Sequence, residues 1–313
     1  MQPVAVVVGG SRGIGRQVAL DLAQAGYLVV VAAKTTSDPS SLATFPPDPN
    51  SNDSTINTVV REINEAGGHS LAIKVDTRSV DSVNALFTQV MDKFARLDVL
   101  VYNSGAIWWS SVEKTPYKRF KLMQEVNVEG LYACIQAAMA IFQKMHWRAR
   151  VVVVCPPIYS RFFRGKTAYA VGKVGMSVLV KGLAMDWERE GKERMAISGI
   201  WPATAIQSAA TEQFQAQDAS TAARLRKPAV FAEAIVAMLG APEGVVNGLL
   251  TTDEDFLREH CGVVDFAKYS VVEGSSPPRI MPLEFPVLEV AEQDDQGRRV
   301  DSTKMAPKEK AKV

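Results

Sequence analysis

A glycine-rich turn between a strand and a helix near the start of the chain constrains the fold more than any other feature. Residues 4–8 are a run of valine and alanine, which is typical of a strand buried on both faces of a parallel sheet. Residues 16–25 have apolar side chains at helical spacing, and the turn before them contains Gly9, Gly13 and Gly15. These glycines have no Cβ to block a ligand, and the free N–H groups at the start of a helix attract phosphate. The stretch therefore predicts a site for a dinucleotide pyrophosphate.

Buried strands and amphipathic helices alternate along most of the chain. After the first strand, apolar runs predict further strands at 27–33, 71–75, 99–101, 151–154 and 248–252. The segments that connect the first four predicted strands have apolar residues at helical spacing. Such alternation implies parallel strands joined by helical crossovers. We therefore expect one doubly wound α/β domain with helices on both faces of a parallel sheet.

The composition argues against several classes of partner. The 35 basic and 34 acidic residues leave a net charge of +1, so neither a nucleic-acid nor a membrane partner is expected. A small-molecule substrate is expected instead. The cysteines Cys134, Cys155 and Cys261 have neither metal-ligand spacing nor an even disulfide framework. The first strand begins almost at Met1, and no apolar run approaches the ~20 residues of a membrane span. A cytoplasmic protein without a bound metal or a cleaved leader is expected.

The second strand ends in a cation where some dinucleotide folds have an acid. It runs into Lys34 and Thr35, at the place where such folds hold the adenosine ribose. An acidic residue there would bind the 2′-hydroxyl of NAD, and none is present. Arg12 lies in the glycine-rich turn nearby, so a 2′-phosphate would meet two basic side chains. The sequence favours NADP(H) over NAD; the alternative is that Lys34 and Arg12 are solvated surface charges.

Tyr169 and Lys173 are the candidate catalytic pair. They lie four residues apart near the start of the helix that follows the strand at 151–154, so they share one face of it. A nearby ammonium stabilises a phenolate and lowers the pKa of the phenol. Such a phenol can pass a proton to or from a carbonyl oxygen while hydride moves at carbon. The alternative is a surface pair, but the position after the fifth strand of a dinucleotide fold favours catalysis.

Asn127 is a polar residue in a mostly apolar helix predicted from Pro116 to about Met145. By residue type alone it would be a core amide with its hydrogen bonds satisfied.

Together these residues resemble the short-chain dehydrogenase/reductase family. The glycine turn, Asp76, Asn103-Ser104-Gly105, Asn127 and Tyr169-x-x-x-Lys173 follow the order and spacing of that family over about residues 3–260. The resemblance implies a Rossmann-type domain with a seven-stranded sheet. Closer similarity is to the dehydrogenase module of hydroxysteroid dehydrogenase-like peroxisomal proteins, carried by the stretches 32–35, 156–157, 173–177 and 201–206.

The resemblance also implies roles for individual residues. Tyr169 would be the proton donor, Lys173 its activator and a ribose anchor, and Asn127 would hold a proton-relay water. Contacts to the cofactor are expected from Gly9, Ser11, Arg12, Gly13, Ile14, Gly15, Lys34, Asp76, Asn103, Gly105, Tyr169, Lys173, Pro202 and Thr204. The helices at 116–145 and 169–190 resemble the pair through which the family commonly dimerises or tetramerises, so a homodimer or homotetramer is expected.

The chain departs from the family at the end of the fifth strand. The family usually has a serine there that donates to the substrate oxygen, whereas this chain has Cys155 and Pro156. A thiol donates weakly and proline has no N–H, and the loss of one such donor typically costs ~3 kcal/mol. Slow carbonyl reduction or different chemistry is therefore expected. Reduction of C=N, a non-redox cyclase or isomerase, and an NADP-binding regulatory protein are the alternatives.

The substrate side is expected to be apolar and bulky. Residues 204–225 are predicted to form a helical flap over it. The candidate substrate contacts are Cys155, Tyr159, Trp108, Ile206 and Phe214, with Trp109, Phe162 and Phe163 as further apolar candidates and Ser160 as a possible replacement for the serine.

The domain is expected to span 1–270, with a long polar loop at 36–57, followed by an extended and partly disordered tail at 271–313. The last residues, Ala-Lys-Val, only loosely resemble a peroxisomal address, so a peroxisomal location is the alternative to a cytoplasmic one.

Overall fold

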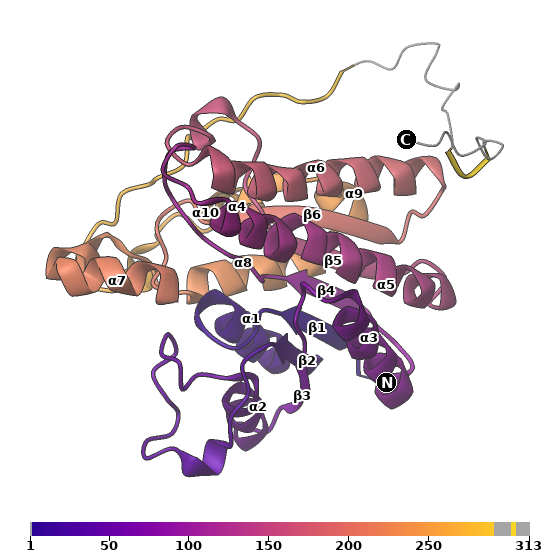
Figure 1. Cartoon of the computed structure of the whole chain (residues 1–313), viewed down its shortest axis with the longest axis horizontal. Coiled ribbons are helices and arrows are strands. Elements are labelled where there is room, and N and C mark those ends of the chain that lie inside the picture. The colour runs from indigo at the N-terminus through magenta and orange to yellow at the C-terminus, as the bar shows by residue number, and fades with distance from the viewer. Residues whose placement is uncertain (1, 291–301, 305–313) are drawn as a thin grey trace.

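A seven-stranded parallel sheet with helices on both faces forms the body of the protein (Figure 1). The computed structural model describes residues 2–290 and 302–304. The strand order is β3-β2-β1-β4-β5-β6-β7. The strands are β1 (Val4–Val8), β2 (Leu28–Ala33), β3 (His69–Lys74), β4 (Val99–Tyr102), β5 (Ala149–Val154), β6 (Met195–Trp201) and β7 (Leu250–Thr252). The expected doubly wound α/β fold is confirmed.

Ten α-helices are present in the described residues. They are α1 (Gly13–Gln24), α2 (Ile56–Glu65), α3 (Val80–Phe94), α4 (Tyr117–Gln124), α5 (Gly130–Lys144), α6 (Thr167–Arg189), α7 (Ala209–Gln217), α8 (Ala229–Gly240), α9 (Glu243–Val246) and α10 (Asp253–Cys261). Every strand predicted from the sequence is found with its ends shifted by at most two residues. The bounds of β6 and the presence of α10 were not predicted from the sequence.

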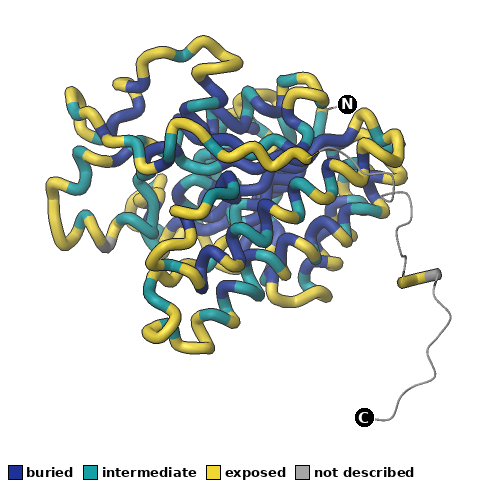
Figure 2. Tube along the Cα trace, turned by 90° about the horizontal axis from the view of Figure 1, so that it is seen from above, coloured by how far each residue is buried: buried dark blue, intermediate teal, exposed yellow. Residues whose placement is uncertain are grey.

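Strand β1 lies at the centre of the sheet and explains the valine run. It pairs with β2 on one side and with β4 on the other. Val4, Val6 and Val8 pack into the core on the α3, α5 and α6 side, whereas Ala5 and Val7 pack on the α1, α2 and α8 side. Figure 2 shows that the buried segments of the chain gather at the centre of the molecule. Strands β2 and β3 lie on one side of β1, and the chain then crosses to β4 on the other side. This reversal of strand order opens a crevice at the carboxyl end of β1.

Helix α6 is longer and more apolar than expected from the sequence. By length and composition alone its 23 residues would suffice to cross a membrane, so the expectation that no apolar run approaches that length is wrong for this helix. Half of its most apolar window is buried, and Met176, Val180 and Trp187 pack in the core. A core helix passes the same test, and α6 is part of the core.

The segment at 271–290 contains no helix or strand of the sheet, and it lies against the domain. In Figure 1 this gold segment runs from the α7 side of the molecule toward α6. Arg279 pairs with Asp255 on α10, and Glu289 pairs with Lys181 on α6 at 2.7 Å. The Ala-Lys-Val end of the tail lies outside the described residues. Residues 271–290 therefore add to the domain surface.

Candidate active site

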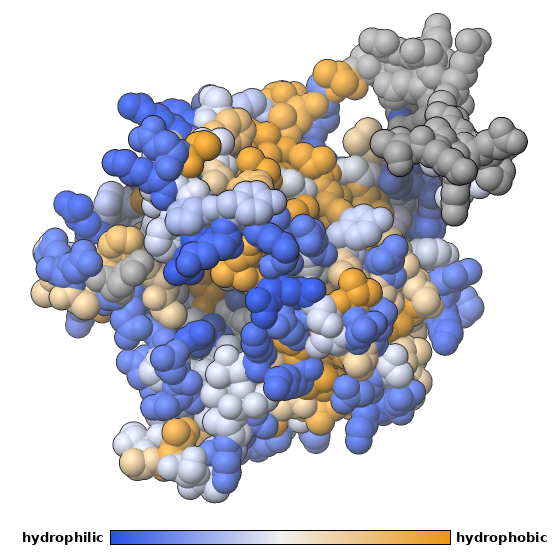
Figure 3. Space-filling model, viewed as in Figure 1, coloured by the Kyte–Doolittle hydropathy of each residue, from blue (hydrophilic) through white to orange (hydrophobic). Residues whose placement is uncertain are grey.

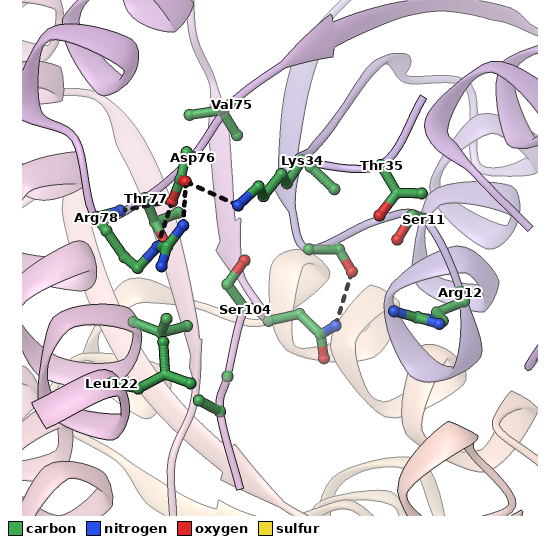
Figure 4. Close-up of a pocket in the computed structure, with 16 residues that line it drawn as sticks. Ser11, Arg12, Lys34, Thr35, Val75, Asp76, Thr77, Arg78, Ser104 and Leu122 are labelled. Atoms are coloured by element: carbon green, nitrogen blue, oxygen red, sulfur yellow. Dashed lines mark hydrogen bonds and ion pairs between the residues drawn. The ribbon is translucent and has the colours of Figure 1, made fainter. Parts of the chain in front are cut away.

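A cavity of about 560 Å³ lies at the carboxyl ends of the central strands, next to the glycine-rich turn (Figure 4). It brings together these residues predicted to contact a cofactor: Gly9, Ser11, Arg12, Lys34, Asp76, Asn103 and Gly105. The remaining turn residues, Gly13, Ile14 and Gly15, form the first turn of α1. A dinucleotide would therefore meet backbone N–H groups at one end of this cavity and charged side chains at the other.

Close packing requires glycine in the turn. A Cβ on Gly15 would lie 2.0 Å from the carbonyl oxygen of Gly9, and a Cβ on Gly9 would lie 2.6 Å from the backbone nitrogen of Ser104. Gly9 also has a φ of +86°, which favours glycine. The Asn103 side chain donates to the Gly9 carbonyl at 3.0 Å and ties the turn to the end of β4. The turn is thus fixed in shape by its own packing.

The long loop at 36–57 lies against the same turn. Pro49 accepts a hydrogen bond from the Gly13 N–H at 2.9 Å, and Ser54 donates to the Ser11 carbonyl at 2.7 Å. The Arg12 guanidinium donates to Asn52 at 2.8 Å. Asn50 is buried beside Gly13, and its side-chain oxygen has no hydrogen-bond partner. The loop therefore orients Arg12 and packs against the glycine-rich turn.

Charged residues gather at the other end of the cavity. Figure 4 shows Lys34 and Arg78 converging on Asp76, with Arg12 on the opposite side of the cavity. The Asp76 carboxylate pairs with two cations: the Arg78 guanidinium lies 2.6 Å from it and the Lys34 ammonium 3.3 Å from it. The hydrogen bond from Arg78 holds the pKa of Asp76 well below its usual range. Arg78 was not predicted; the only signal was its place two residues after Asp76, at the end of β3.

A second cavity of about 240 Å³ adjoins the first, since Asn103 and Gly105 line both. Most of its lining is apolar. It includes Ile107, Trp109, Val154, Trp201, Ile206 and Ile280, with Tyr169 and Lys173 as the titratable groups. This apolar chamber favours a substrate with a hydrophobic body.

Tyr169 and Lys173 are both buried near the start of α6, where they line this chamber. Lys173 Nζ donates to the Val154 carbonyl oxygen at 2.9 Å, and burial lowers its pKa to about 8. Burial raises the pKa of Tyr169. The expectation that Lys173 lowers this pKa is not met, because burial outweighs the ammonium while Lys173 is directed at Val154. Tyr169 therefore holds its proton at neutral pH, as a proton donor must.

Asn127 lies in a π-helical turn, Glu125–Glu129, that joins α4 to α5. The predicted single helix is thus interrupted by a wider turn, a feature that often accompanies functional sites. Asn127 is fully buried, and its amide both accepts from the Ala106 N–H at 2.8 Å and donates to the Ala106 carbonyl at 3.2 Å. It thereby fixes the loop after β4 that both cavities share. The expected relay water stays a prediction.

The turn from Pro202 to Thr204 closes the far side of the chamber. Thr204 is buried, and its hydroxyl oxygen has no hydrogen-bond partner. Asp253, at the start of α10, accepts the Ala203 N–H at 2.8 Å. An unpaired buried hydroxyl is costly unless a ligand satisfies it. This hydroxyl and the glycine turn fit a nicotinamide dinucleotide, which offers both an amide and phosphates.

Asp253 predicts an unusual dependence of stability on pH. Its complete burial raises its pKa from 3.8 to about 7. Between these values the folded state binds more protons than the unfolded state, so the free energy of unfolding falls as pH rises, by about 2–4 kcal/mol in total. Asp253→Asn should remove this fall, because an amide oxygen can still accept from Ala203 and cannot ionise.

Urea unfolding of both proteins at a series of pH values measures the effect. The exposed Asp92→Asn on α3 is the control and should keep the wild-type slope. An unchanged slope in Asp253→Asn would show that Asp253 does not titrate in this range.

Three of the expected substrate contacts are corrected by their positions. Cys155 is fully buried in the core on the α6 side, where burial raises the pKa of its thiol to about 12, so it does not line the chamber. Trp108 instead stacks against Arg119, with the guanidinium carbon 4.6 Å from a ring centroid, and Trp109 takes the lining position. Tyr159 donates to Met281 in the C-terminal segment. Adjacent residues on a loop point to different sides, which the sequence did not resolve.

Two other expected contacts remain near the chamber. Ile206 lines it, and Phe214 on α7 stacks on Trp109 with ring centroids 5.9 Å apart. Ser160 is exposed, outside the lining, and does not take the place of the missing serine. The hydroxyl groups that line the chamber belong to Tyr169, Ser208 and Thr211.

Comparison with known proteins identifies relatives of the whole domain. A family model described as Enoyl-(Acyl carrier protein) reductase matches residues 50–250, and one described as short chain dehydrogenase matches residues 3–45. The chain is 34% identical over 270 residues to hydroxysteroid dehydrogenase-like protein 2 of Danio rerio and 32% identical to that of Rattus norvegicus. These matches cover 86% of this chain, 60% of the Danio protein and 48% of the rat protein. The chain thus spans about half of these relatives.

Solved structures of dehydrogenases and a ketoreductase have the same fold as this chain. A putative dehydrogenase from Xanthomonas campestris is 30% identical with a TM-score of 0.75, covering 93% of this chain and 98% of that one. A short chain dehydrogenase from Mycobacterium thermoresistibile is 32% identical with a TM-score of 0.76, covering 88% and 93%. An actinorhodin polyketide ketoreductase with NADPH shares the fold at 21% identity and a TM-score of 0.66, covering 80% of this chain and 95% of the ketoreductase chain.

Proposed function

Since this chain belongs to the short-chain dehydrogenase/reductase family, we propose that it is an NADPH-dependent reductase that transfers hydride to a C=O or C=N group of a bulky apolar molecule. The observation that carries the proposal is the position of Tyr169 and Lys173. Both are buried in the apolar chamber, which adjoins the larger cavity through Asn103 and Gly105. A proton donor thus lies where an apolar substrate would meet the end of a dinucleotide.

The residues of the chain divide the work between binding and proton transfer. When bound, NADPH supplies the hydride. The glycine turn and Thr204 would hold its phosphates and its amide. Tyr169 would donate its proton to the substrate oxygen or nitrogen. Lys173, with a pKa of about 8, is mostly protonated at neutral pH. It would stabilise the phenolate that remains once its ammonium turns to the phenol from the Val154 carbonyl, to which it donates in this structure.

The shortage of hydroxyl donors bears on the choice between C=O and C=N. Val154, Cys155 and Pro156 supply no side-chain donor to the chamber where the family usually has a serine. A carbonyl oxygen gains negative charge during reduction and needs such a donor. A protonated imine starts with a positive charge and needs it less. C=N reduction is therefore a specific candidate for this site.

NADPH consumption should be screened with matched panels of ketones, aldehydes and cyclic imines. Faster turnover of imines than of the matching ketones would support C=N reduction. Product formed equally well with NADP⁺ or without cofactor would instead indicate a cyclase or isomerase. Tight NADPH binding without turnover of any panel member would indicate a regulatory protein.

Arg12 predicts the preference for NADPH. Arg12→Ala is expected to weaken NADPH binding about 10- to 100-fold and NADH binding less than about twofold, because a charge-assisted hydrogen bond to the 2′-phosphate is lost. Lys34→Ala should cost less, since Asp76 already holds Lys34. Fluorescence titration with both cofactors measures the effect, with the exposed Lys144→Ala on α5 as the control. Equal losses for NADPH and NADH would assign Arg12 to the pyrophosphate instead.

The surface over α5 and α6 supports the proposed homo-oligomer. Figure 3 shows apolar side chains gathered on this face of the molecule. Tyr132 on α5 and Val178 and Met185 on α6 are each about half exposed, and Tyr132 lines a groove of about 380 Å³ between α5 and α6. A second copy of the chain would cover these side chains.

The cytoplasmic location stays a prediction.

A further inference from the structure

One wall of the apolar chamber comes from the C-terminal segment. The backbone N–H groups of Ile280 and Met281 both donate to the Ala203 carbonyl, at 2.8 and 3.1 Å. Thr204 and Arg279 form an antiparallel bridge beside them. Residues 279–281 are therefore paired with the turn that closes the chamber, and the Ile280 side chain lines it. We call residues 279–281 the strap.

An ion pair holds the strap at its start. Arg279 donates to both oxygens of Asp255 on α10, at 2.7 and 2.5 Å, and to the carbonyl oxygens of Met281 and Pro282. Both charged side chains are largely buried. The paired geometry of guanidinium and carboxylate fixes orientation as well as distance. Arg279 therefore cannot shift along α10 without losing several bonds.

An aromatic contact holds the strap at its end. Met281 is buried and accepts a hydrogen bond from the Tyr159 hydroxyl at 3.3 Å. Phe285 packs on the Tyr159 ring with centroids 5.7 Å apart. Ile280 thus lies between two anchors. Its own side chain is bound by neither and is about half exposed, which places it at the mouth of the chamber.

We propose that Ile280 sets the size of substrate that can enter the chamber, and that the Arg279–Asp255 pair is the positioning device that holds it there. The inference rests on the proposed function, because it concerns the substrate side of the same site. The strap lies beyond residue 250, where the match to the family model ends. The rest of the chamber lining includes the aromatic and branched side chains of Trp109, Trp201 and Ile206. A change of volume at the strap is therefore the simplest way to alter selectivity.

The test compares cyclohexanone with tetralone, a fused bicyclic ketone, in the presence of NADPH. Ile280→Ala should lower KM for tetralone relative to cyclohexanone by about tenfold, and Ile280→Trp should raise the same ratio by about tenfold or more. NADPH affinity should stay within about twofold in both variants. Leu283→Ala, an exposed site two residues beyond the strap, is the matched control and should leave the ratio unchanged. Equal ratios in Ile280→Trp and the wild type would overturn the proposal.

The positioning pair has a separate readout. Arg279→Gln should make the KM ratio approach that of Ile280→Ala and speed amide hydrogen exchange at Ile280 and Met281, whereas Arg279→Lys should restore part of the selectivity. A purely structural role would lower thermal stability in Arg279→Gln and leave the ratio of the folded enzyme unchanged, and this result would overturn the positioning role.

Binding measurements separate this proposal from the proposed function. Quenching of the Trp109 and Trp201 fluorescence by each ketone gives dissociation constants that do not depend on turnover. If no variant consumes NADPH, the proposed reductase activity fails, and the ratio of the two dissociation constants still decides the role of Ile280.

Discussion

Tyr169→Phe is expected to lower kcat by between about a hundredfold and ten thousandfold, because the substrate loses its only well-placed proton donor. The phenyl ring would keep the contacts of Tyr169 with Trp109 and Phe162, whose ring centroids lie 6.2 and 6.3 Å away. NADPH affinity and thermal stability should therefore change little. Single-turnover oxidation of NADPH with the best substrate of the panel measures the loss directly.

Tyr117→Phe is the matched control for this prediction. Tyr117 is 77% exposed at the start of α4, so removal of its hydroxyl group should leave kcat unchanged. Turnover that survives in Tyr169→Phe would remove Tyr169 as the proton donor. The remaining hydroxyl groups of the chamber, those of Ser208 and Thr211, would then be the next residues to change.

Gly15→Ala is expected to have the largest effect on the fold. The added Cβ would lie 2.0 Å from the Gly9 carbonyl oxygen and 2.5 Å from the Asn103 amide nitrogen that donates to it. The clash can be relieved only by moving the start of α1 away from the turn that follows β1. A loss of more than about 3 kcal/mol in the free energy of unfolding is expected, together with loss of measurable NADPH binding.

A glycine in open space provides the control. Gly240, at the end of α8, has no atom within 4 Å of the place where a Cβ would be. Gly240→Ala should therefore leave the protein as stable as the wild type or raise its stability by up to about 1 kcal/mol, through a better helix propensity. Urea unfolding and NADPH titration of both variants make the comparison. Wild-type stability in Gly15→Ala would mean that the turn can open to accept a side chain.

The sequence predicted the central strands β1, β2, β4 and β5 well because nearly all of their residues are buried. Five-residue runs such as β1 must be apolar throughout, and the glycines after it are required by contacts that no other residue permits. β6 was harder to delimit, since Ser198 and Gly199 interrupt its apolar pattern. Helix α10 begins with three acidic residues, Asp253–Asp255, and its amphipathic pattern is short. Such local signals are weak beside the tertiary contacts that stabilise the helix.

The residues on the cofactor side of the site could be predicted from the sequence better than those on the substrate side. The cofactor side is built from strand ends whose order follows from the chain, so Arg12, Lys34 and Asp76 were found together. The substrate side is built from loops, where a shift of one residue exchanges Trp109 for Trp108. Ile280 was not predicted for another reason. It belongs to the C-terminal segment, whose composition does not indicate where that segment packs on the domain.

The π-helical turn between α4 and α5 implies a conflict between robustness and activity. A plain α-helix from Tyr117 to Lys144 would have better hydrogen-bond geometry than a helix with a widened turn at Asn127. The chain nevertheless keeps one residue more in this turn than a regular helix would hold. Deleting a single residue there would restore regular α-helical hydrogen bonding through this segment. Selection for heat resistance alone would favour that shorter form, whereas selection for turnover would preserve the irregular one.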